Sequence, residues 1–176
     1  MNQKALTPEY KLRLKNYYKK CIISEGSKLI IFSLIFYSLS LFKEYLIALF
    51  LLLVLRTNGG GLHCKKYRSC FLLSFFMILG NIVFAHYFAP TLIVFCIILL
   101  ICLPIMMVLV PITSAYRPKP STRIVKKSKI ITFIFTLFFM LYSCTIAPKI
   151  VRNIGFWTII MHTGQLIFAK ITKTRR

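Results

Sequence analysis

The sequence predicts an all-α, multi-pass integral membrane protein with about six membrane helices, of which the first two are short and hairpin-like. Two observations predict this class. Hydrophobic residues make up 58% of the 176 residues and the mean hydropathy is +0.76, whereas about half of a soluble domain is apolar. The apolar residues also occur in long runs rather than in an alternating or heptad pattern, which indicates lipid as the solvent.

The charged residues are almost all basic. There are 24 Lys and Arg residues against three acidic ones, which gives a formal net charge of +21. On a soluble protein this charge would indicate nucleic acid, but beside long apolar runs it indicates anionic lipid headgroups. We therefore expect anionic membrane lipids, and no nucleic acid, as partners. The scarcity of acids also excludes paired-carboxylate catalysis and magnesium or calcium cages.

Residues 1–28 are predicted to form an amphipathic helix on the membrane surface. Thr7, Pro8 and Glu9 mark its start, because a hydroxyl cap, a proline in the first turn and an acid at the positive end all favour helix initiation. Apolar residues then recur at helical spacing among lysines, a pattern typical of interfacial helices. The alternative is a plain basic cap before the first membrane span.

Two short apolar segments follow, Leu29–Phe42 and Tyr45–Leu55, and Lys43 and Glu44 split them. Each is shorter than the ~20 residues of a full span, so they form either one helix with a buried charge pair or a hairpin of short crossings. The remaining apolar runs predict four longer helices: Cys70–Ala89, Thr91–Val110 with a kink at Pro104, Ile130–Ala147 and Ile154–Ala169.

The basic residues favour the hairpin. Segments 56–69 and 111–129 are both rich in Lys and Arg, and the positive-inside rule places them in the cytoplasm together with both termini. All but three of the 24 basic residues are then cytoplasmic; the exceptions are Lys43, Lys149 and Arg152. We expect one membrane-embedded domain over residues 1–176, with a reactive loop at 56–70 and a basic cytoplasmic loop at 111–129.

The loop at residues 56–70 is the one place where reactive side chains gather. His63 and Cys70 are the residue types of a thiol nucleophile and its general base. Cys70 begins an apolar helix, whose positive end favours the thiolate form of a thiol, as do the neighbouring lysines. On one straight helix the two residues would lie ~10.5 Å apart along the axis. The chain must therefore turn between them, and the consecutive glycines that end at Gly61 allow such a turn.

Simpler interpretations exist for the same residues. The glycines alone are typical of a flexible turn. His63, Cys64 and Cys70 could be three zinc ligands, but they lack the usual spacing and a nearby fourth ligand. We therefore expect no metal and no other cofactor.

The other histidines and cysteines indicate packing. His86 stands beside Tyr87 at the outer end of a helix, where an interfacial anchor is expected, and His162 in the last span is expected to be a hydrogen-bonded packing group. Of the six cysteines, Cys96, Cys102 and Cys144 lie inside apolar runs and are interpreted as small apolar fillers, which argues against a disulfide framework.

The residues around the reactive loop resemble the signature of a known family. Arg56, Gly61, His63 and Cys70 follow the pattern R-x4-G-x-H-x6-C, which is similar to that of the accessory gene regulator B (AgrB) family. The resemblance extends to the layout, with a basic amphipathic N-terminus, paired short spans before the motif and a basic loop after the fourth helix. One departure is Cys64, because a small non-nucleophilic residue is more usual there.

The resemblance implies a bacterial membrane cysteine endopeptidase of peptide quorum sensing, with its active site in the cytoplasm. Cys70 would attack the scissile carbonyl, and His63 would act first as base and then as acid. A thiol or hydroxyl of the precursor would then capture the acyl group and close a thiolactone or lactone ring. Asn58, Glu44 or a backbone carbonyl could orient His63, and these alternatives stay open.

The resemblance also implies the partners. The substrate would be a small precursor peptide with an acidic C-terminal region, and a homodimer is implied by the resemblance alone. Lys126, Lys127 and Lys129 would attract the acidic region, and Gly60 and Gly61 would support the site. Arg56 would either bind a substrate carboxylate or hold the loop, and we favour the loop.

Two other functions compete. A non-enzymatic membrane protein, such as a peptide exporter, a channel subunit or a holin-like protein, fits the small size, but no long helix shows a polar stripe. Lipid acyl transfer through Cys70 is a second hypothesis for an enzymatic function. A neighbouring reading frame for a short precursor would favour the peptidase over both.

Overall fold

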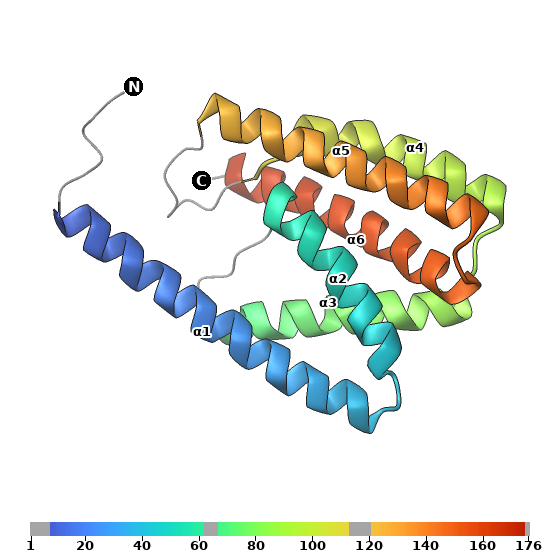
Figure 1. Cartoon of the computed structure of the whole chain (residues 1–176), viewed down its shortest axis with the longest axis horizontal. Coiled ribbons are helices and arrows are strands. Elements are labelled where there is room, and N and C mark those ends of the chain that lie inside the picture. Colours follow the sequence, from blue (N-terminus) through green and yellow to red (C-terminus); the bar gives the residue numbers. More distant parts are fainter. Residues whose placement is uncertain (1–7, 62–66, 113–120, 175–176) are drawn as a thin grey trace. The chain divides into compact units, whose positions relative to one another are not determined.

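The computed structural model describes residues 8–61, 67–112 and 121–174, and the described residues form six helices (Figure 1). The helices are α1 Pro8–Ser38, α2 Phe42–Gly59, α3 Tyr67–Tyr87, α4 Leu92–Leu109, α5 Thr122–Thr145 and α6 Lys149–Thr174. Within these ranges the one extended pairing is an isolated bridge between Gly60 and Ile112. The predicted all-α fold is confirmed.

The chain divides into two compact units, Met1–Phe42 and Lys43–Arg176. The first contains α1, which begins at Pro8 as predicted but continues without a break to Ser38. The prediction of a surface helix that ends at residue 28, followed by a separate span, was therefore wrong. Within α1, Lys28 Nζ lies 2.7 Å from Glu25 Oε1 one turn earlier, an ion pair that adds local stability where the charged part of the helix meets its apolar part.

The break between the first two helices lies at residues 39–41, not at Lys43 and Glu44 as predicted. Ser40 takes a positive φ of 57°, which ends α1 in the left-handed conformation common after helix C-termini. Glu44 instead stands in the first turn of α2, where the positive end of the helix favours an acid. The alternative of one continuous helix over both apolar segments is thus excluded.

The second unit is organised around α6, which packs against both α3 and α4 (Figure 1). In its most apolar stretch 56% of the residues are buried inside the protein, against 28% for α3 and 22% for α4. Asn153 Nδ2 donates to the carbonyl of Ala85 at 3.1 Å, and Trp157 Nε1 donates to that of Phe88 at 3.0 Å. These bonds hold the start of α6 against the end of α3.

The outside of the second unit is apolar and much of its inside is polar. Phe76, Val108 and Leu141 are among many large apolar side chains that are exposed. Asn81 and Thr136, by contrast, are fully enclosed. This distribution is typical of helices surrounded by lipid, because polar groups there avoid hydrocarbon by facing other helices.

Three of the described helices are long and apolar enough to cross a membrane: Tyr67–Tyr87, Leu92–Leu109 and Lys149–Thr172. Together with these buried polar side chains they identify the chain as an all-α membrane protein. The expectation of about six spans, with the first two short, remains a prediction for the other helices.

Several helices extend further into basic segments than predicted. α2 continues through Arg56 to Gly59, α3 begins at Tyr67 rather than at Cys70, and α6 begins at Lys149 rather than at Ile154. The second half of the expected loop 111–129 is also wrong, because α5 begins at Thr122. Lys and Arg are good helix formers, so a loss of hydropathy marks where a helix leaves the lipid and not where it ends.

Candidate functional site

Cys70 lies in the first turn of α3 and its side chain is buried. The amide N–H groups of the first turn have no partner inside their own helix and carry its positive partial charge. The Cys70 thiol therefore lies at the N-terminal end of α3. His63 and Cys64, the other reactive residues of the predicted loop, lie outside the described residues.

Arg56 joins the end of α2 to the same face of α3. Its Nη1 donates a hydrogen bond to Ser74 Oγ at 3.2 Å, and Ser74 is buried. Ser74 follows Cys70 by one helical turn, so both point to the same side of α3. The structure therefore gives Arg56 a contact that holds the end of α2 close to the first turns of α3.

The glycines after Arg56 form a tight turn rather than a loose one. Gly60 has a φ of +78°, and the N–H of Ile112 donates to the carbonyl of Gly59 at 2.9 Å. A Cβ atom at Gly60 would collide with the backbone carbonyl of Ile112. The end of α2 is thereby attached to the segment that follows α4, a contact that no sequence pattern indicated.

Two side chains of α6 face this turn. The Nε2 atom of His162 lies 2.9 Å from the position that a Cβ at Gly59 would occupy, and Gln165 Oε1 lies 3.3 Å from that position at Gly61. His162 was predicted to be a hydrogen-bonded packing group, and this was wrong in one respect: neither ring nitrogen has a hydrogen-bond partner among the described residues. The signal available in the sequence was the spacing of His162 and Gln165, which puts both on one helix face.

That face also corrects the expectation that no long helix has a polar stripe. Thr158, His162 and Gln165 follow one side of α6 and all three are buried.

His86, by contrast, is exposed in the last turn of α3, the position expected of an interfacial anchor. Asn58 donates its amide to the carbonyl of Val54 in its own helix at 2.8 Å.

The three predicted binding lysines lie on a helix and not on a loop. Lys126, Lys127 and Lys129 occupy the first turns of α5, whose start is capped by Ser121 Oγ accepting from the N–H of Ile124 at 3.4 Å. Lys126 and Lys127 are exposed, and Lys129 is half-buried. They are the fifth, sixth and eighth residues of α5, beyond the first turn in which the helix dipole acts most strongly.

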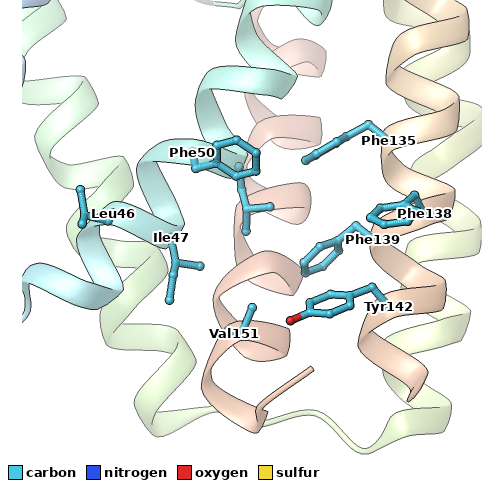
Figure 2. Close-up of a pocket in the computed structure, with 9 residues that line it drawn as sticks. Leu46, Ile47, Phe50, Phe135, Phe138, Phe139, Tyr142 and Val151 are labelled. Atoms are coloured by element: carbon cyan, nitrogen blue, oxygen red, sulfur yellow. The ribbon is translucent and has the colours of Figure 1, made fainter. Parts of the chain in front are cut away.

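A separate apolar cavity of about 460 Å³ lies between α2, α5 and α6 (Figure 2). Four residues of α2, four of α5 and Val151 of α6 line it, and Tyr142 carries the one hydroxyl group among them. The cavity holds no nucleophile, acid or base suited to catalysis. It is therefore not the candidate site.

Neither metal ligands nor disulfides are found in the described part of the chain. No three His, Cys, Asp or Glu side chains come together there, although two of the zinc ligands considered above, His63 and Cys64, lie outside it. Cys70, Cys96, Cys102 and Cys144 form no disulfide, and the sulfurs of Cys96 and Cys144 are 3.7 Å apart across α4 and α5.

These features define a class: a helical membrane protein with a buried thiol in the first turn of a helix and an arginine that bonds the same helix one turn further on. The sequence model of the AgrB family (accessory gene regulator B) matches residues 2–166 of this chain, and the chain belongs to this family. Its role is accordingly in the processing of a quorum-sensing peptide precursor. No curated protein and no solved structure matches the chain.

Proposed function

We propose that the protein is a membrane cysteine endopeptidase that removes the C-terminal part of a small peptide precursor and promotes ring closure of the remainder. The observation that carries this proposal is the place of Cys70, buried in the first turn of α3 on the face that Arg56 reaches through Ser74. A nucleophilic thiol benefits from the helix dipole and from a nearby cation. The glycine turn ends at Gly61, two residues before His63. Such a turn allows the chain to bring His63 back toward Cys70, which favours His63 as the base.

In the proposed reaction His63 takes the proton of the Cys70 thiol, and the thiolate attacks the scissile carbonyl. The C–N bond then breaks, the leaving amine receives the proton from the imidazolium, and an acyl-thioester remains on Cys70. A thiol or hydroxyl within the precursor attacks this thioester, forms the ring bond and releases the Cys70 thiolate. Closure is aided because the attacking group is tethered to the acyl group.

The direct test is co-expression of the protein with the short precursor encoded beside it, followed by mass spectrometry of the peptides. The proposal expects a cleaved C-terminal fragment and a cyclic product lighter by one water than the corresponding linear acid. Release of an unmodified precursor across the membrane, with no cleavage, would instead indicate an exporter. An acylated lipid in place of the cyclic peptide would indicate lipid acyl transfer.

The cluster of Lys126, Lys127 and Lys129 supports an acidic substrate region. Two of these cations are exposed near the start of α5, where they can attract an anion. In this proposal they recruit the acidic part of the precursor and do not take part in bond breaking. Anionic lipid headgroups are the competing ligand for the same charges.

Replacing Lys126, Lys127 and Lys129 together by glutamine is expected to raise the apparent KM for precursor by about tenfold, with the maximal rate little changed. The increase should shrink as salt concentration rises, because salt screens charges beyond about 10 Å. Initial rates over a range of precursor concentrations measure both values. Glutamine at Lys43 and Lys149, which are predicted to face the other side, is the control; a loss of maximal rate alone would assign the α5 lysines to folding or catalysis.

The proposed orientation places both termini and Cys70 on the cytoplasmic side. Ser69, Ser121 and Lys149 are all exposed, so single cysteines there in a cysteine-free background should react once a reagent reaches them. In intact cells a membrane-impermeant maleimide is expected to label position 149 and to leave positions 69 and 121 unlabelled, and permeabilised cells should label all three. External labelling at position 69 would overturn both the orientation and the cytoplasmic site.

A further inference from the structure

The face of α6 beneath the glycine turn contains buried polar atoms without a partner. His162 has 0% exposure and neither ring nitrogen is hydrogen-bonded within the described residues. Gln165, one turn further along α6, is also buried, and its Oε1 has no partner in the same part of the chain. Both residues point toward the backbone of residues 59–61.

Burial of such groups is unfavourable. An unsatisfied buried polar group costs about 1–3 kcal/mol, and lipid offers no water to compensate. Buried polar side chains in membrane helices are therefore usually functional. A leucine or phenylalanine at position 162 would pack against α2 without this penalty, so simple packing does not account for a histidine.

The surroundings of His162 connect it to the candidate site. Its Nε2 atom faces Gly59, the last residue of α2, at 2.9 Å from the ideal Cβ position. The Arg56 guanidinium interacts electrostatically with the ring and also bonds Ser74, one turn from Cys70. The chain leaves this turn at Gly61 and reaches His63 two residues later. The imidazole is thus next to the last residue of α2 and is affected by the charge of the arginine that bonds Ser74.

We propose that His162 is a positioning residue for peptide processing, which orients the glycine turn and Arg56 through Nε2. Gln165, one helical turn further along α6, supports the glycine turn. This inference rests on the proposed function, because it assigns to His162 the role of keeping His63 in position relative to Cys70. His162 does not touch the reacting atoms in this assignment. Its polar edge keeps the end of α2 in one place relative to α3.

The test compares three replacements of His162 in the co-expression assay. Phenylalanine keeps an aromatic ring but removes both nitrogens, glutamine places an amide near the position of Nε2, and asparagine places one near that of Nδ1. The phenylalanine variant is expected to lose about tenfold to a hundredfold in maximal rate, since small misplacements of reacting groups have effects of this size. Its apparent KM should stay within about twofold, because precursor recruitment is assigned to α5.

Glutamine is expected to restore most of the rate and asparagine much less of it, because Nε2 is the atom that faces Gly59. A purely structural role would not distinguish these two amides in this order. Gly164→Ala is the matched control on the same helix, because a Cβ there meets no atom within 4 Å. It should process precursor at the wild-type rate.

Wild-type processing by the phenylalanine variant would overturn the proposal and leave His162 as a packing residue. If the phenylalanine variant does not accumulate in the membrane, the glutamine and asparagine variants provide the test. Equal processing rates for these two variants would also overturn the proposal. Cys70→Ala is assayed alongside. Activity that survives Cys70→Ala contradicts the proposed function itself, whereas an inactive Cys70→Ala beside a fully active His162→Phe contradicts only the positioning role.

Discussion

Replacing Cys70 by alanine is expected to abolish cleavage of the precursor while leaving the protein at its normal level in the membrane. The substitution removes the sulfur that forms the covalent bond to the substrate. Cys70 is largely enclosed in the first turn of α3, but the change deletes only one atom from a small side chain, so the packing effect is minor. The measurement is mass spectrometry of the released fragment, with protein abundance determined on the same membranes.

Three further substitutions separate the proposed roles around Cys70. Cys70→Ser should reduce the rate nearly as far, because a hydroxyl is far less acidic than a thiol despite its similar size. His63→Ala should lower the rate by about 10²–10⁴-fold, the usual contribution of a general acid–base group. Cys64→Ala should retain substantial activity, since Cys64 adjoins His63 and adjacent side chains generally diverge.

The pair of cysteine variants can contradict the mechanism outright. If Cys64→Ala is inactive and Cys70→Ala still cleaves, the nucleophile is Cys64 and the helix start of α3 has another role. Trapping of the acyl-thioester gives an independent check, because the proposed intermediate adds the mass of the precursor fragment to the peptide that contains Cys70. Addition to the peptide that contains Cys64 would support the opposite assignment.

Replacing Gly60 by alanine is expected to eliminate processing through the backbone rather than through a lost functional group. At its φ of +78° an L-residue is disfavoured by roughly 1–2 kcal/mol. The added methyl group would also meet the carbonyl of Ile112, which is backbone and cannot rotate away as a side chain can. The turn between α2 and His63 must therefore move, and a shift of about 1 Å is enough to impair catalysis.

Processing assays and membrane levels of Gly60→Ala distinguish a displaced turn from a general loss of folding. Gly26→Ala in α1 and Gly164→Ala in α6 are matched controls, because neither new Cβ meets an atom within 4 Å. Both should be neutral or slightly more stable, as alanine favours a helix by up to about 1 kcal/mol over glycine. Full activity of Gly60→Ala would show that the turn is free to adjust and that its close contact with Ile112 has no role in processing.

The four later helices were predictable from the sequence, whereas the helix ends and the continuity of α1 were not. Long apolar runs indicated each of the later helices, because burial in lipid requires about 20 apolar residues in succession. Arg56 and Lys126 were assigned to loops since their charges exclude them from lipid. A charge excludes a residue from hydrocarbon but not from a helix, so α2 and α5 extend past the apolar runs that hydropathy detects.

The candidate site was partly predictable for a related reason. Cys70 and Arg56 stand out because reactive and charged residues are rare beside apolar runs, and their spacing resembles that of a known family. For His162 and Gln165 the sequence offered only their spacing on one helix face. An isolated histidine in an apolar helix is equally consistent with packing, and its relation to Gly59 depends on a contact between residues about a hundred positions apart in the chain.

By itself, the sequence determined that this chain is a helical membrane protein, and it predicted a reactive stretch at residues 56–70. These properties follow from composition, hydropathy and charge. They are local quantities, because the preference of a segment for lipid or water depends on its own residues. Only the tertiary structure decided that the glycine turn lies against Ile112 and α6, and that Arg56 reaches Ser74. Such contacts depend on how α2, α3, α4 and α6 pack together, and in lipid that packing rests on close approach at small residues and on a few polar bonds.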